Sequence, residues 1–329
     1  LAGVLNLIIA HLKKRAFNKL LIISVLVMVI SGNLTKNIKW TNPVDSIDVS
    51  IYQPNLTLEK KWSFSGIEKT KEMMERAIDN ANNSELIIFP ETALIFNESV
   101  QKEWLDSIAK KALLKDVGLI TGIIDRIETK EVVSSKIRNR LKGYGAAEGV
   151  YDKTHLVPFG EYIPFFSFLG PLLDILKLKL TNTEPGSSYH VLKFGNIRIS
   201  PSICYEIAFS NLVLKTAINS DLLVTISNDT WFGRSIGPEQ HLEIAQTRAI
   251  EHQKPLLRAT NSGISAIVDK KGKIIAQQGF FEEKKLRGQI IINKGTTFYS
   301  KYGNIPLYAL IILSFLIMMY LKITKVSKN

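Results

Sequence analysis

The middle of the chain alternates short apolar runs with stretches of helical spacing. Five runs, mostly rich in β-branched residues, predict strands: Ser46–Tyr52, Glu85–Phe89, Val117–Ile124, Ile197–Ile203 and Leu222–Ser227. Apolar residues recur at helical spacing in three further stretches: Ile67–Ala81, Val100–Leu114 and Leu242–Ile250. Ile264–Ala276 predicts a hairpin that turns at Lys270–Gly272. Strands that alternate with helices favour a single α/β domain in which helices cover a sheet.

Longer apolar runs lie at the two ends of the chain. Ile305–Leu321 is uncharged and precedes a lysine-rich tail. At the start, Leu1–Ala10 and Leu20–Ile30 flank the basic stretch His11–Lys19. Crossing a bilayer takes roughly 17–25 apolar residues. We therefore expect a C-terminal transmembrane helix over the first of these runs and membrane segments within residues 1–33.

The basic residues beside these runs predict an orientation. Lysine and arginine are enriched in the cytoplasmic loops of membrane proteins, which places His11–Lys19 and the C-terminal tail in the cytoplasm. Everything from about residue 33 to residue 304 is then outside, on the periplasmic side of a bacterial inner membrane. A cleaved signal peptide is the alternative reading of the N-terminus. Because the sequence opens inside an apolar run, we expect earlier membrane helices to be missing from it.

Composition narrows the classes of function. A formal net charge of +12 is typical of proteins that bind nucleic acid or an anionic membrane surface, and of membrane proteins with basic anchoring residues on the cytoplasmic side of their spans. No aromatic-basic recognition motif is present, so we expect no nucleic-acid partner. The one cysteine, Cys204, excludes an intrachain disulfide and a multi-cysteine zinc site. The five histidines show no metal-ligand spacing, and we expect neither a metal nor another cofactor.

Three chemically active residues follow strand-like segments. Glu91 comes after "ELIIFP", Lys153 after "GVYD" and Cys204 after "IRISPSI". In α/β folds, functional residues collect at the carboxyl ends of strands. Taken alone, each residue also has a structural interpretation: Glu91 as a carboxylate at a helix N-terminus, Lys153 as a solvated lysine and Cys204 as a small buried hydrophobe.

Together these residues suffice for acyl transfer through a thioester. A free thiol has a pKa of about 8.5, so little of it is thiolate at neutral pH, and a nearby carboxylate such as Glu91 can act as its general base. A cation such as Lys153 can stabilise the oxyanion of the tetrahedral intermediate. The thiol of Cys204 then carries the acyl group.

Longer motifs around these residues resemble a known family. "FPETA", "YDKTHLVPFGEYIP" and "SICYEIAF" resemble the nitrilase superfamily, which uses a Glu-Lys-Cys triad on an α-β-β-α sandwich. "KTHLVPFGEYIP", "ISNDTWFGRSIGPEQH" and "RATNSGISA" are similar to the membrane branch of that family, the apolipoprotein N-acyltransferases. The resemblance implies a nitrilase-like catalytic domain over residues 44–294, flanked by transmembrane helices.

The resemblance also implies roles for particular residues. Glu91, Lys153 and Cys204 are the expected catalytic triad. The expected substrate-binding and supporting residues are Trp62, on a mobile loop near the lipid-access site, Glu161, on a loop over the active site, and Tyr205 and Glu206, which follow the nucleophile. A structural role stays open for each of these four. Asn228 and Trp231 are expected to shape the pocket wall, and the apolar segment Ile163–Leu180 is either an amphipathic arm that dips into the membrane or a buried helix.

The resemblance implies a reaction between two lipids. A phospholipid donates an acyl chain to Cys204, and the N-terminal amine of a diacylated apolipoprotein then takes it in a ping-pong reaction. A membrane-tethered amidase that hydrolyses small C–N bonds is the alternative and would use the same triad. A catalytically inactive lipid-binding module is a weaker reading, because Glu91, Lys153 and Cys204 are all present.

Overall fold

The computed structural model describes residues 19–35, 37–81, 85–96, 98–127, 136–162, 164 and 183–326. The chain divides into two compact units, Leu1–Trp40 and Thr41–Asn329. Helix α2 (Lys19–Thr35) belongs to the first unit. The second unit contains two β-sheets with their covering helices and all the residues considered for catalysis.

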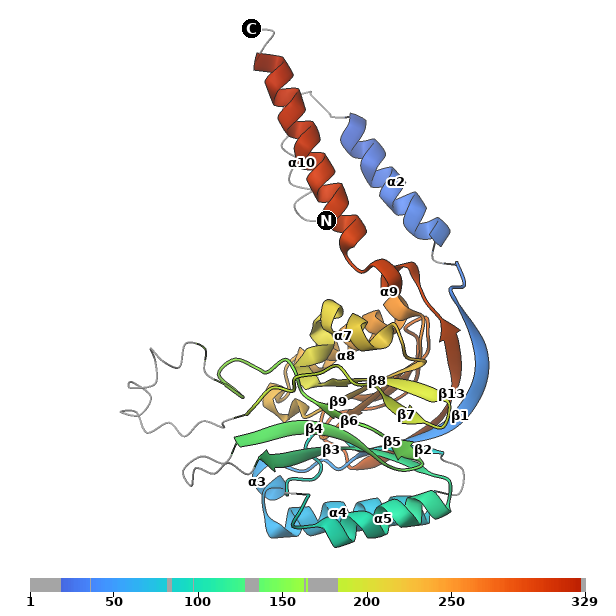
Figure 1. Ribbon diagram of the computed structural model, residues 1–329, viewed down its shortest axis with the longest axis vertical. Coiled ribbons are helices and arrows are strands. Elements are labelled where there is room, and N and C mark those ends of the chain that lie inside the picture. The colour runs from blue at the N-terminus through green and yellow to red at the C-terminus, as the bar shows by residue number, and fades with distance from the viewer. Residues whose placement is uncertain are drawn as a thin grey trace, which may run out of the picture. The chain divides into compact units, whose positions relative to one another are not determined.

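Two sheets form the centre of the second unit (Figure 1). The six-stranded sheet has the order β13-β1-β2-β3-β4-β6, and the seven-stranded sheet has the order β12-β11-β10-β9-β8-β7-β5. The strands of the first sheet are β1 (Thr41–Gln53), β2 (Leu86–Ile88), β3 (Gly118–Ile127), β4 (Lys136–Gly145), β6 (Val150–Asp152) and β13 (Lys284–Gly295). Those of the second are β5 (Ala147–Glu148), β7 (Leu192–Phe194), β8 (Ile197–Ile203), β9 (Leu222–Ser227), β10 (Leu256–Thr260), β11 (Ser265–Val268) and β12 (Ile274–Gln278).

Strand direction decides which strand ends meet. Strands β1, β2 and β3 are parallel, and β6 runs with β3 because both pair antiparallel with β4. Strands β8, β9 and β10 are also parallel to one another. The carboxyl ends of β2 and β6 therefore lie at one edge of the first sheet, and those of β8 and β9 lie at one edge of the second.

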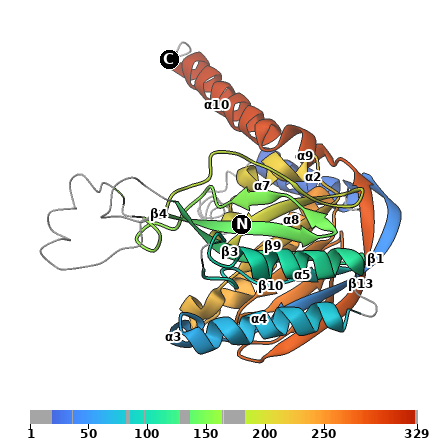
Figure 2. The same ribbon diagram turned by 60° about the horizontal axis from the view of Figure 1, so that its bottom comes forward.

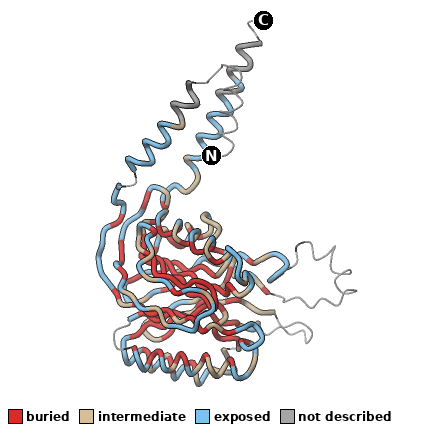
Figure 3. The backbone as a smooth tube through the Cα atoms, turned by 180° about the vertical axis from the view of Figure 1, so that it is seen from behind, coloured by how far each residue is buried: buried red, intermediate tan, exposed pale blue. Residues whose placement is uncertain are grey.

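The two sheets pack face to face between two layers of helices, as Figures 1 and 2 show. Alternation along β2 illustrates the layering: Ile88 packs in the cluster between the sheets, whereas Ile87 packs with the helices. Helices α4 (Phe64–Asp79) and α5 (Lys102–Leu114) cover the first sheet, and α7 (Ser210–Ala217) and α8 (Gly237–His252) cover the second. Buried residues are concentrated in the sheets (Figure 3). The architecture is the predicted α-β-β-α sandwich.

The elements predicted from apolar spacing are confirmed. All five predicted strands are present as β1, β2, β3, β8 and β9, and the three helical patterns fall in α4, α5 and α8. The predicted hairpin consists of β11 and β12, with Gly272 at φ +77° in the turn between them. Left-handed backbone of this kind favours glycine.

Strand β4 was not predicted from the sequence, because it is rich in charged residues. Its sequence, KIRNRLKGYG, lacks a clear apolar alternation. Arg140 forms ion pairs with Asp125 and Asp152, and Lys142 forms one with Glu98. Neighbouring carboxylates thus satisfy charges that would otherwise argue against a strand. The sequence also left β10, β13 and α7 unpredicted.

The two ends of the chain are helical where the structure describes them. Besides α2, helix α10 (Ile305–Val326) follows the short helix α9 (Phe298–Tyr302). In the part of the chain that the structure describes, no helix has both the length and the apolarity needed to cross a membrane. The transmembrane segments expected from the sequence stay predictions. Leu1–Ala10 and nearly all of Ile163–Leu180 lie outside the described residues.

Candidate active site

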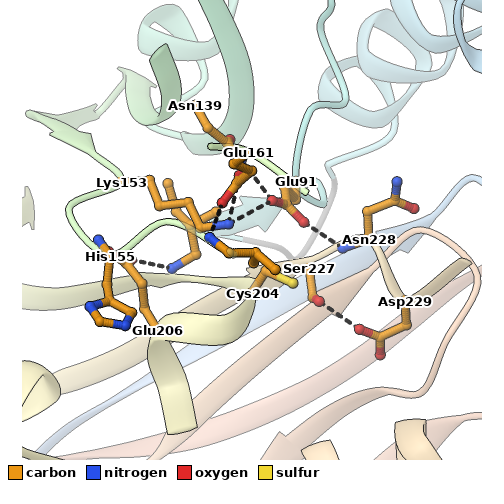
Figure 4. Close-up of polar contacts among 12 residues, drawn as sticks. Glu91, Asn139, Lys153, His155, Glu161, Cys204, Glu206, Ser227, Asn228 and Asp229 are labelled. Carbon is orange, nitrogen blue, oxygen red and sulfur yellow. Dashed lines mark hydrogen bonds and ion pairs between the residues drawn. The ribbon is translucent and has the colours of Figure 1, made fainter. Parts of the chain in front are cut away.

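Strand ends from both sheets bring the predicted triad together (Figure 4). Glu91 follows β2 and Lys153 follows β6, both in the six-stranded sheet. Cys204 follows β8 in the seven-stranded sheet, where it begins the 3-10 helix η1 (Cys204–Ala208). Asn228 follows β9, the neighbour of β8. The site therefore spans the junction between the two sheets.

Hydrogen bonds fix the carboxylate of Glu91 at both oxygens. Its Oε1 accepts a hydrogen bond from Asn139 Nδ2 at 2.7 Å and lies 3.7 Å from Lys153 Nζ. Its Oε2 accepts a hydrogen bond from the backbone N–H of Asn228 at 2.7 Å. The side chain is buried, with 6% of its surface exposed. Glu91 is thus oriented by both sheets before any substrate arrives.

Lys153 stays an ammonium ion despite being buried. Burial lowers the pKa of an amine, but the nearby Glu91, Cys204 and Glu161 raise it further, so the net pKa lies above that of an ordinary lysine. The Nζ atom donates to Glu161 Oε1 at 2.8 Å. The side chain is 2% exposed. The site therefore holds a fixed positive charge, which suits the stabilisation of an oxyanion.

Cys204 is held in a left-handed conformation, with φ +53°. This is uncommon for a residue other than glycine and occurs often at functional sites. Burial raises the pKa of the Cys204 thiol to about 12; the Glu91 carboxylate also raises it, and Lys153 lowers it. The thiol is therefore protonated at neutral pH and needs a base before it can act as a nucleophile.

A buried network of charged and polar side chains contacts the backbone of Cys204. The pKa of His241 is lowered by burial and by the Arg258 cation, so its imidazole is neutral. Its Nε2 lies 3.1 Å from the backbone oxygen of Cys204, and its Nδ1 lies 3.1 Å from Arg258 Nη2. A carbonyl accepts and a guanidinium donates, so the proton is on Nε2. Arg258 also pairs with Asp229, which accepts a hydrogen bond from Ser227 at 2.6 Å.

Glu206 links the segment that carries Cys204 to the segment that follows Lys153. Its Oε1 accepts hydrogen bonds from the Tyr151 hydroxyl, the Thr154 hydroxyl and the backbone N–H groups of Thr154 and His155, at 2.7–3.0 Å. Its Oε2 accepts a hydrogen bond from the Ile203 N–H at 2.8 Å. With none of its surface exposed, Glu206 has the contacts of a supporting residue, which is one of the two roles the sequence left open.

The other three predicted supporting residues differ in their surroundings. Glu161 lies within the site, where it accepts hydrogen bonds from Lys153 and, at 2.8 Å, from the Val157 N–H. Tyr205 is 39% exposed, and its ring lies 5.9 Å from that of His155. Trp62 is 51% exposed and follows helix α3 (Leu58–Lys61) as its C-cap. Tyr205 and Trp62 are therefore accessible at the surface, whereas Glu161, whose side chain is 18% exposed, belongs to the ionic cluster around Lys153.

The sequence prediction missed three residues that shape the site. Asn139 contacts both Glu91 and Glu161, yet it lies in the charged strand β4, whose pattern gave no signal. Lys61 donates to the backbone oxygen of Glu91 at 2.9 Å, but a lysine next to another lysine resembles a solvated pair. His241 lies in the motif "ISNDTWFGRSIGPEQH", which could have drawn attention to it.

The face-to-face sheets and the thiol, carboxylate and lysine at their junction define a nitrilase-type protein. The carbon-nitrogen hydrolase family model matches residues 48–294, and the chain belongs to this family. Two solved structures share the fold. Saccharomyces cerevisiae Nit3 has a TM-score of 0.55 at 18% identity, covering 77% of this chain and 92% of Nit3. A carbon-nitrogen hydrolase from Helicobacter pylori has a TM-score of 0.56 at 16% identity, covering 75% of this chain and 89% of that protein.

Curated relatives carry a more specific name, apolipoprotein N-acyltransferase. The protein of that name from Photobacterium profundum is 36% identical over 88% of this chain and 57% of the relative. The one from Haemophilus influenzae is 35% identical over 96% of this chain and 63% of the relative. The chain thus spans about three fifths of the length of these relatives. The resemblance to apolipoprotein N-acyltransferases drawn from the sequence motifs is confirmed.

Proposed function

We propose that this protein is an N-acyltransferase that moves an acyl chain from a phospholipid to the N-terminal amine of a diacylglyceryl-cysteine lipoprotein. The observation that carries acyl transfer is the convergence of the only thiol of the chain with a buried carboxylate and a buried ammonium ion. The name of the relatives supports the lipoprotein acceptor. Glu91, Lys153 and Cys204 are the proposed catalytic residues.

In the first half of the reaction, the acyl chain passes from the phospholipid to Cys204. Glu91 takes the proton of the Cys204 thiol as the sulfur attacks the ester carbonyl carbon of the phospholipid. Lys153 stabilises the negative charge that develops on the carbonyl oxygen. The intermediate collapses by breaking the ester C–O bond, and the protonated Glu91 returns the proton to the departing lysophospholipid. The product is a thioester on Cys204.

In the second half of the reaction, the acyl chain passes from Cys204 to the acceptor amine. The free α-amine of the acceptor attacks the thioester carbon, and Lys153 again stabilises the oxyanion. Glu91 accepts a proton from the attacking amine, and the C–S bond breaks to leave an amide. That proton then returns to the sulfur of Cys204. Each group ends in its starting state, as a ping-pong cycle requires.

We further propose that the chain works at a membrane, with segments inside residues 1–33 and 305–321 in the bilayer and the 44–294 domain on the periplasmic side of the bacterial inner membrane. Large apolar side chains on α2 and α10 support this proposal, because most of those described are exposed and need apolar surroundings: Val27, Met28, Leu34, Leu307, Leu310 and Phe315. Both proposed substrates are lipids of such a membrane.

Trapping the intermediate tests the activity. Incubating the full chain with phospholipid alone should add the mass of one fatty acyl chain to Cys204, and neutral hydroxylamine should remove it. A diacylated lipopeptide with a free α-amine should then discharge the thioester into an amide, whereas Cys204→Ala should never load. An amidase would instead release an acyl group to water without the lipopeptide. Acylation of lipopeptide without any loaded enzyme would overturn the thioester route.

A further inference from the structure

A second lysine is buried beside the catalytic carboxylate. Lys61 ends helix α3, whose first turn is capped by the Thr57 hydroxyl. The residues on either side of it, Lys60 and Trp62, are exposed, whereas Lys61 is only 4% exposed. Its ammonium nitrogen donates to the backbone oxygen of Glu91 at 2.9 Å. Helix α3 thus directs one lysine out to solvent and the next one into the site.

The charge of Lys61 is not matched by a carboxylate of its own. In the described part of the chain, the salt bridges of this cluster join Lys153 to Glu161 at 2.8 Å and to Glu91 at 3.7 Å, and none involves Lys61. An ammonium group has three donors, and burying a charge is costly unless it is paired. Burial lowers the pKa of Lys61 to about 8, and only the negative charges of Glu91 and Cys204 oppose this.

We propose that Lys61 is a second functional lysine of this site, which holds the backbone of Glu91 and favours the thiolate of Cys204 by its positive charge. The thiolate appears only when Cys204 reacts, which explains why the resting site leaves Lys61 without an ion pair. This inference rests on the proposed function only in taking Cys204 as the nucleophile. Lys61 acts through Glu91 and Cys204, so it is a positioning residue.

The pH dependence separates an electrostatic role from a merely structural one. Glu91 and Cys204 are the charged groups that act on Lys61, and Lys153 in turn forms ion pairs with Glu91 and Glu161. Below about pH 8 Lys61 is charged and assists thiolate formation, and above that pH the assistance fades as the ammonium loses its proton. A structural role would give an effect that does not change with pH.

Alkylation of the only cysteine by iodoacetamide, a neutral reagent, measures this effect without any lipid. Lys61→Met should alkylate about tenfold more slowly than wild type below pH 7, the effect of roughly one unit in the thiol pKa. The gap should close above pH 8. Lys61→Arg keeps its charge at all pH values and should overtake wild type above pH 8. Lys60→Met, on the exposed neighbour, is the matched control and should follow wild type throughout.

Equal alkylation rates of Lys61→Met and wild type across pH 6–9 would overturn the proposal, as would a rate ratio that stays constant with pH. Circular dichroism checks that each variant is folded. Should Lys61→Met not fold, the comparison of Lys61→Arg with wild type above pH 8 decides the question. Failure to form a thioester from phospholipid, with the Lys61 effect intact, would instead count against the acyltransferase function.

Discussion

At the scale of single residues, we propose that the thiol of Cys204 reacts and that the charged groups around it prepare it for reaction. The thiol of Cys204 has a pKa raised to about 12, so it cannot ionise at neutral pH without help. Glu91 is held by a donor on each oxygen, and Lys153 keeps its charge. Reactivity is therefore a property of the cluster and not of the cysteine alone.

Substitutions in the triad should affect turnover far more than substitutions around it. Cys204→Ala, Glu91→Gln and Lys153→Met should each lower the rate of lysophospholipid release by roughly 10²–10³-fold or more, because each removes a group that acts on the reacting atoms. Glu161→Ala should cost less, since Glu161 acts by orienting Lys153. Wild-type turnover in Glu91→Gln would remove Glu91 from the role of base.

The buried Asp229–Arg258 pair should contribute to stability. Asp229→Asn leaves Arg258 charged and fully buried, which should lower the free energy of unfolding by roughly 3–5 kcal/mol. Burial raises the pKa of Asp229, but the Arg258 cation and the hydrogen bond from Ser227 lower it more, so the net pKa is below normal. The contribution of this pair to the free energy of unfolding is therefore present above the ordinary aspartate pKa of about 4. It is lost as the pH falls towards the lower pKa that Asp229 has in the folded protein.

Denaturant unfolding at pH 7 and at pH 3 checks this prediction. The difference in unfolding free energy between wild type and Asp229→Asn should be smaller at the lower pH. Asp106→Asn, on the exposed face of α5, serves as the control and should leave stability unchanged. An Asp229→Asn protein as stable as wild type at pH 7 would contradict the assigned role of the pair.

At the scale of elements, the proposed triad comes together because its three residues follow the carboxyl ends of β2, β6 and β8. The sequence reveals the strands that carry Glu91 and Cys204, because β2 is an apolar run and β8 has an isoleucine at positions 197, 199 and 203, all on one face of the strand. It does not reveal Asn139, because the charges of β4 are satisfied only by residues distant in the chain. Lys61 escapes for a related reason: its burial depends on the packing of α3 against the site, which no local pattern encodes.

The 3-10 helix η1 should depend on Glu206. Glu206→Gln replaces an acceptor-only group with one that carries N–H donors, so some of the buried donors facing it lose their partner. Each unsatisfied buried donor costs about 1–3 kcal/mol, and both stability and turnover should fall. Glu148→Gln, in the exposed end of β5, is the control. Thermal unfolding and lysophospholipid release are the measurements, and an unchanged melting temperature in Glu206→Gln would contradict the prediction.

At the scale of the whole molecule, the proposed membrane topology makes its own prediction. Basic residues flank both proposed membrane regions on the same side, so a reporter fused after Asn329 should be active only in the cytoplasm. One inserted within Glu128–Glu131 should be active only in the periplasm. Paired phosphatase and fluorescent-protein fusions, made in the same two positions, provide the measurement and its control. The reverse pattern would overturn the localisation.

The division of the site between two sheets has a consequence for partly folded states. Glu91 and Lys153 stand on one sheet and Cys204 on the other, and Asn228 and Glu206 bridge them by hydrogen bonds. In a molten globule, strands and helices persist while tertiary packing loosens. Such a state would keep every residue of the proposed triad in its own element and still separate the thiol from Glu91, its proposed base. Loss of turnover would then indicate that packing between the two sheets has loosened, before far-ultraviolet circular dichroism shows any loss of secondary structure.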